Sequence, residues 1–163
     1  MNYVFTGLAI ANTILFLLTA GTGYMAFGAL IPRPTHIMAG LFIAIFTCLV
    51  HSIIFVYFIG TGKSIKTACE EFKLEGDFVR VTKKLKGRTF PFALFGSLSM
   101  MAAAFTGGAA ATEAGSTDTH HAAVLTASIL SAICFFFEYK AVCGNMVLLA
   151  RLGNALPAAD ETP

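Results

Sequence analysis

The chain has 163 residues, of which 56% are hydrophobic and only 12% are charged. Its mean hydropathy is +0.76, and soluble domains carry about twice this charged fraction. The composition therefore excludes an ordinary soluble domain and predicts an integral membrane protein. The net charge of +2 is too small to indicate a nucleic-acid partner.

Four long apolar blocks predict four transmembrane helices. The first covers residues 3–25; it has no basic residue at its start and is too long for the apolar part of a signal peptide, so we expect it to be retained. The second, residues 35–60, follows the helix breaker Pro32-Arg33-Pro34. The third and fourth cover residues 90–111 and 121–139. Each is about as long as the ~20 helical residues that cross a hydrocarbon layer.

These blocks predict an all-α, four-transmembrane-helix bundle. Strands of a membrane barrel would alternate apolar and polar residues, and these runs do not. A helix, in contrast, satisfies its own backbone hydrogen bonds in lipid. We expect one transmembrane domain over residues 1–153 and a flexible, Pro- and Ala-rich tail over residues 154–163.

The connection between the second and third blocks predicts a short amphipathic helix. Apolar residues recur there at spacings of three and four, with charged residues between them: Ile65, Ala68, Cys69 and Phe72. Such a helix would lie on the cytoplasmic membrane surface or against a partner, and Gly76 would end it.

The segment Gly60-Thr61-Gly62-Lys63-Ser64 resembles the end of a phosphate-binding loop. That motif requires a glycine where this chain has Tyr57, and it follows a strand rather than an apolar helix. We therefore expect no nucleotide site.

The loop charges predict the orientation in the membrane. Eight of the 11 basic residues lie between Lys63 and Arg88 in the second connection, whereas the first connection has one and the third has none. The positive-inside rule places the second connection and both termini in the cytoplasm. The expected location is a prokaryotic inner membrane or an equivalent energy-transducing membrane.

Three histidines are predicted to lie at one outer membrane level. His36 opens the second block, and His120 and His121 open the fourth. Two imidazoles on facing helices can bind one haem b. The three histidines with Asp118 could instead bind copper or zinc, or they could simply meet headgroups or another subunit. Adjacent helical residues point about 100° apart, so at most one of His120 and His121 faces His36.

The size, span number and sparse histidines are similar to those of four-helix b-type cytochromes. Two haems in such a bundle need histidines paired in both leaflets. Here the residue fourteen positions after His120 is Cys134, and the first block has no histidine. We therefore expect at most one haem and do not assign the chain to that family.

Polar residues inside the apolar blocks form a second group of interest. Ionisable residues within a membrane are costly, and they mark functional sites or proton paths. Glu138 could accept a proton beside His51, or it could pair with Lys140 near the inner boundary. Asn12 is expected to make one interhelical hydrogen bond.

Two helix faces are predicted to pack closely against neighbours. The third block is rich in small residues, including Ala103 and Gly107, which allow close approach or leave a slot for a planar cofactor. The fourth block carries a small and polar stripe: His120, Ala127, Ser131, Cys134 and Glu138.

The sequence contains no convergent set of acid, base and nucleophile, so we expect a non-catalytic protein. A short four-helix chain is typical of a structural or anchoring subunit of a larger membrane assembly, and sparse histidines favour an energy-transducing or electron-transfer complex. One alternative is a cytochrome-b-like electron carrier with one haem b near the outer side. Another is a small ion or proton transporter that uses Asn12, His51 and Glu138. The expected partners are lipid and other membrane subunits.

The predicted orientation can be tested by cysteine labelling on intact cells. In a cysteine-free background, we expect an impermeant thiol reagent to label Ser116→Cys and to leave Ser64→Cys unlabelled, because only the former faces the outside. Labelling of Ser64→Cys alone would reverse the orientation.

Overall fold

The computed structural model describes residues 1–74 and 76–156, and over this part the chain is all-helical. The helices are α1 (Asn2–Phe27), α2 (Arg33–Glu71), α3 (Phe78–Ala111) and α4 (Thr117–Ala155). All four are long and apolar enough to cross a membrane. The predicted all-α class with four long apolar helices is confirmed, and these helices indicate a multi-pass membrane protein.

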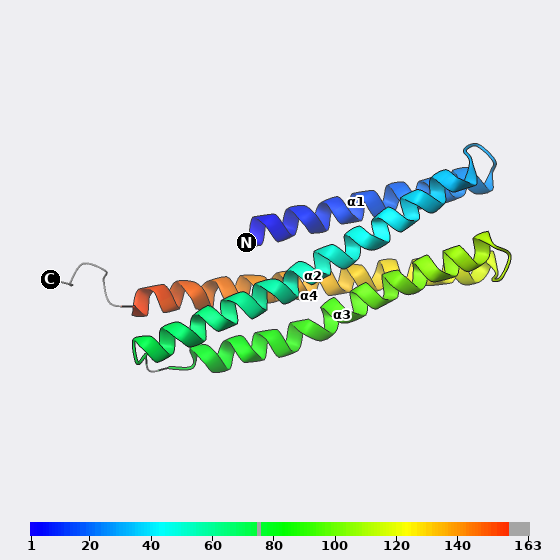
Figure 1. Ribbon diagram of the computed structural model, residues 1–163. Coiled ribbons are helices and arrows are strands. Elements are labelled where there is room, and N and C mark those ends of the chain that lie inside the picture. The colour runs from blue at the N-terminus through cyan, green and yellow to red at the C-terminus, as the bar shows by residue number, and fades with distance from the viewer. Residues whose placement is uncertain (75, 157–163) are drawn as a thin grey trace.

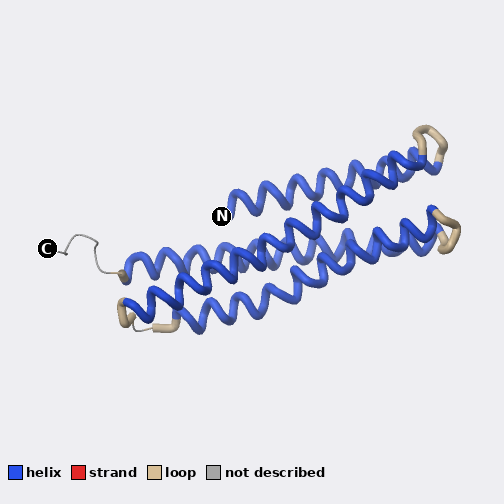
Figure 2. The backbone as a smooth tube through the Cα atoms, in the orientation of Figure 1, coloured by secondary structure: helices blue, strands red, loops and turns tan. Residues whose placement is uncertain are grey.

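The helices form two antiparallel hairpins that lie side by side (Figure 1). The α1–α2 and α3–α4 turns lie at one end of the bundle, and the α2–α3 turn lies at the other (Figure 2). The second and third helices pack against each other, whereas α2 and α4 touch over a short stretch only. The hairpins diverge toward the end that carries the α1–α2 and α3–α4 turns.

The helices extend further than the apolar blocks. The expected short amphipathic helix is not evident as a separate element, because α2 continues without a break to Glu71. The second apolar block was expected to end at residue 60, but Gly60 and Gly62 each cost only about 1 kcal/mol relative to alanine in a helix. Burial of Ile65 against α3 and α4 offsets that cost. Of the expected tail, residues 154–155 belong to α4, and residues 157–163 lie outside the described part.

One end of the bundle carries the α2–α3 turn, and it is termed the inner end after the orientation expected from the loop charges. At this end α2, α3 and α4 project beyond the start of α1 (Figure 1). They hold together through a separate apolar cluster of Ile65, Phe78, Leu148 and Leu152. The turn that joins α2 to α3 contains Gly76, whose φ of +133° favours glycine. Next to it, the Arg80 guanidinium donates to the Asp77 carboxylate and lowers the pKa of that carboxyl group.

The middle of the bundle has its own apolar cluster, and so does the opposite end, termed the outer end, which carries the α1–α2 and α3–α4 turns. Large side chains fill the middle: Phe5, Val50, Ile54, Phe58, Phe135 and Val142. Small residues dominate further out: Ala44, Ala103 and Ala127, together with Met100. The small residues of α3 thus serve close packing, as the sequence predicted for this face.

Gly96 of α3 lies directly against the side chain of His51 on α2. A Cβ atom built on Gly96 would overlap the imidazole of His51. No side chain larger than hydrogen therefore fits there unless the two helices move apart.

We predict that Gly96→Ala lowers the free energy of unfolding by about 1–3 kcal/mol, the usual cost of overpacking. Gly87→Ala is the matched control, because Gly87 lies in the same helix and an added Cβ would meet nothing within 4 Å. Thermal unfolding in detergent measures both variants. Equal stability of Gly96→Ala and the parent would show that α2 and α3 do not approach as described.

Candidate intramembrane polar site

A fully buried ion-pairing contact lies in the middle of the bundle. His51 of α2 and Glu138 of α4 are both 0% exposed, and the distance between His51 Nδ1 and Glu138 Oε1 is 2.8 Å. The His51 ring stacks on Phe135, with ring centroids 4.9 Å apart and an interplanar angle of 19°. Glu138 therefore pairs with His51, and the alternative partner Lys140, two residues further along α4, is exposed.

Each member of the pair has a second polar atom that lacks a partner. His51 Nε2 and Glu138 Oε2 are buried and make no hydrogen bond within the described residues, and neither does Ser131 Oγ. An unsatisfied buried polar group costs about 1–3 kcal/mol, so such atoms are rare in folded proteins. The pair thus has one shared hydrogen bond, and one ring nitrogen and one carboxyl oxygen remain without a hydrogen-bond partner in the described part of the chain.

The predicted small and polar stripe of α4 faces the interior of the bundle and carries Glu138 there. Ala127, Ser131, Cys134 and Glu138 are all buried, as the small and polar character of the stripe predicted. Ser131 and Asn145 lie seven residues before and after Glu138, which is about two helical turns, so all three share one face. On α2, Thr47 lies one turn outward from His51.

Buried hydrogen bonds continue the polar line on both sides of the pair. Toward the outer end, Thr47 donates to the Oδ1 atom of Asn12 over 2.8 Å, which is the interhelical bond expected for Asn12. Toward the inner end, the Asn145 amide donates to Thr61 over 3.0 Å, and Thr82 lies 3.5 Å from Asn145 Oδ1. The sequence had not pointed to this inner cluster. The position of Asn145, seven residues after Glu138, could have indicated it, because that spacing puts both residues on one helical face.

The outer histidines form a separate site where the hairpins diverge. The ring centroids of His36 and His120 lie 6.3 Å apart, and the two ring planes make an angle of 62°. The ring centroid of His121 also lies 6.3 Å from that of His120. His121 instead stacks on Tyr24 of α1. The structure thus brings together His36 and His120 and turns His121 aside, in agreement with the geometric argument that one of the two at most could face His36.

The copper or zinc interpretation gains no support. Within the described residues, no group of three or more His, Cys, Asp or Glu side chains is arranged to hold a metal ion. Asp118 therefore does not complete a site with the three histidines.

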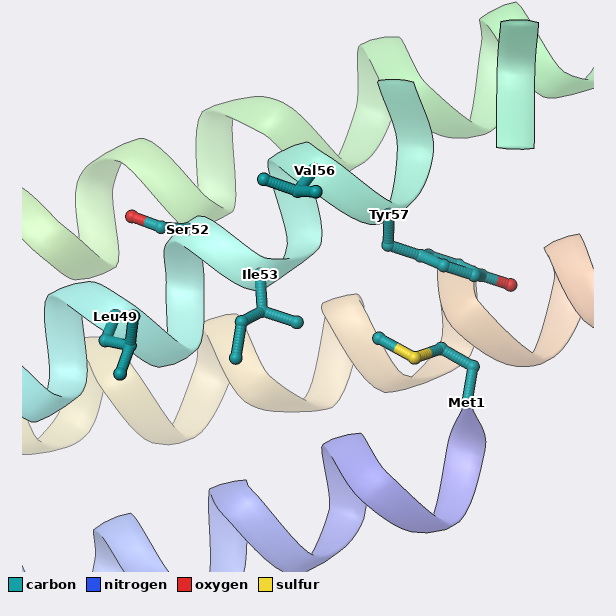
Figure 3. Close-up of a pocket in the computed structure, with 6 residues that line it drawn as sticks. All are labelled: Met1, Leu49, Ser52, Ile53, Val56 and Tyr57. Carbon is teal, nitrogen blue, oxygen red and sulfur yellow. The ribbon is translucent and has the colours of Figure 1, made fainter. Parts of the chain in front are cut away.

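An apolar pocket lies on the flank of the bundle, away from both sites. Met1 closes it from the start of α1, and the remaining lining residues come from α2: Leu49, Ser52, Ile53, Val56 and Tyr57 (Figure 3). Its lining is almost entirely apolar and faces outward. The chemistry of the bundle is therefore to be found in its interior and not in this pocket.

Comparisons of the chain with protein-family models, with curated proteins and with solved structures found no match. Its function is argued from the two sites themselves.

We predict that His51 and Glu138 are strongly coupled in stability. Removing one partner of a buried pair typically costs about 3–5 kcal/mol, because it leaves the other polar group unpaired. His51→Ala and Glu138→Ala should each lower the unfolding temperature in detergent, and the double variant should lose much less than the sum. Glu113→Ala, in an exposed turn, is the control. Additive losses would show that the two side chains do not interact.

Proposed function

We propose that this protein moves protons through the membrane, with His51 and Glu138 as the central proton-carrying pair. One observation carries the proposal: an ionisable pair that is 0% exposed and joined by a 2.8 Å hydrogen bond still has one free nitrogen and one free oxygen. A purely structural pair would be expected to satisfy those atoms, whereas intramembrane carboxylate–histidine pairs are typical of proton relays.

The arrangement of atoms defines a relay step. A proton arriving at His51 Nε2 makes the ring cationic, and the ring then passes its Nδ1 proton to Glu138 Oε1 across the 2.8 Å contact. The carboxyl group is now neutral, and it must rotate before that proton can leave on the side away from His51. The ring is left protonated at Nε2 alone, so it must turn about its Cβ–Cγ bond or exchange protons to regain the Nδ1–H tautomer for the next cycle. Imidazole suits this role because it gains and loses a proton near neutral pH.

The polar groups on either side of the pair support a route to and from it. The Asn12–Thr47 bond lies outward and the Asn145–Thr61 bond lies inward. Between Glu138 and Asn145 the interior is apolar and includes Val142. Water must enter this gap before a proton can pass, so we propose a gated carrier rather than a permanently open channel.

We also propose that the chain works beside other subunits in an energy-transducing membrane. Support comes from the broad apolar faces that the helices turn outward, which suit contact with lipid or with neighbouring helices. In such an assembly the relay would carry protons between a reaction in a partner subunit and one side of the membrane. A subunit with an anchoring role alone would have the same surface but no need for the relay.

Proton flux into proteoliposomes tests the proposal. With an imposed membrane potential and a pH dye inside the vesicles, the parent should acidify the lumen. Glu138→Gln keeps the shape and a hydrogen bond to His51 but cannot release a proton in the same way. It should reduce the rate by about 100-fold, within the range lost when a proton-transferring group is removed.

Two controls make this experiment decisive. Glu113→Gln alters an exposed carboxyl in the α3–α4 turn and should leave the flux unchanged. The unfolding temperature of Glu138→Gln, measured in the same preparation, shows that the variant is folded. Normal flux through folded Glu138→Gln, or no flux through the parent alone and in its native assembly, would leave the anchoring role in place.

A further inference from the structure

The facing histidines at the outer end lie apart from the proton-carrying pair. His51 is fifteen residues further along α2 than His36, which is about 22 Å along the helix axis. No step of the relay uses His36 or His120. Their arrangement therefore needs its own explanation.

We propose that His36 and His120 are the two axial ligands of one b-type haem. A metal–imidazole bond is about 2.0–2.1 Å long, so two rings that bind one ion from opposite sides have centroids about 6 Å apart. The observed separation is 6.3 Å. The two ligands come from different hairpins, so a haem here would tie the diverging ends together.

Each ring is oriented by a hydrogen bond at Nδ1. His36 Nδ1 lies 3.1 Å from Thr22 Oγ1, and His120 Nδ1 lies 3.2 Å from the carbonyl oxygen of Ala103. Neither Nε2 atom makes a hydrogen bond to a described residue. A metal-binding histidine commonly has one ring nitrogen held by such a partner and the other free for the metal.

Glycines position both rings against neighbouring backbones. A Cβ atom on Gly23 would lie 3.0 Å from Cε1 of His36, and one on Gly107 would lie 2.8 Å from Cε1 of His120. Small side chains, including Ala103 and Ala104, surround this end of α3. These are the residues that the sequence suggested could leave room for a planar cofactor.

The number of protein ligands favours haem over a bare ion. The pair offers two imidazoles, and no third His, Cys, Asp or Glu side chain joins them within the described residues. Zinc and copper sites need three or four protein ligands, whereas a haem iron receives four nitrogens from the porphyrin and two from the protein. His121, stacked on Tyr24, is not a ligand in this arrangement.

Titration of the purified full chain with ferric protoporphyrin IX in detergent tests the site. We expect one equivalent per chain and the absorption spectrum of a six-coordinate, low-spin haem. His36→Ala and His120→Ala should each abolish the low-spin spectrum and weaken haem binding at least about 10-fold. His121→Ala is the matched control, because it removes the adjacent histidine and should keep the spectrum.

Further variants separate ligation from misfolding and from the proton relay. His36→Met supplies a different axial ligand and should give a shifted six-coordinate spectrum, whereas a misfolded protein gives none. Glu138→Gln should leave the spectrum unchanged, so the haem site and the relay can fail independently. A high-spin signal indifferent to both histidines, a low-spin spectrum that survives His36→Ala, or binding of zinc but not of haem would each overturn the proposal.

Discussion

A buried polar group in a bundle of apolar helices cannot form hydrogen bonds with water, so it must form them with another part of the protein. In this protein the hydrogen bond between His51 and Glu138 meets that requirement. It joins α2 to α4, two helices that otherwise touch over a short stretch only. It thereby connects the two hairpins in the middle of the bundle. Because each side chain would be costly to bury alone, the position of one determines where the other must lie.

Close helix packing and the placement of histidines depend on each other. Three imidazoles lie directly against glycine backbones: His36 against Gly23, His51 against Gly96 and His120 against Gly107. The missing side chain lets a ring approach the neighbouring helix, and the ring fills the space that the glycine leaves. The small residues of α3 therefore serve two purposes, since they allow helix contact and also position the rings of both proposed sites.

The two proposals assign different chemistry to different depths of one bundle. The His51–Glu138 pair in the middle of the bundle is fully buried, and its Nε2 and Oε2 atoms have no hydrogen-bond partner among the described residues. This arrangement suits the transfer of protons between fixed groups. The outer pair is only partly buried, and its ring spacing of 6.3 Å is the observation on which the proposed haem ligation rests.

The four long apolar helices could be predicted from the sequence, because hydropathy and length are properties of each segment alone. The sequence also indicated which residues share a helical face. It therefore predicted the inward-facing stripe of α4 that contains Ser131 and Glu138. The packing of the helices against one another, in contrast, brings Glu138 to His51, 87 positions away. It also places His120, rather than His121, beside His36. Helical periodicity describes one helix at a time, and it carries no information about which neighbour a given face will meet. The predicted second helix was too short for the same reason. Packing against α3 and α4 stabilises α2 beyond Gly60 and Gly62, and a single helix considered alone does not reveal that packing.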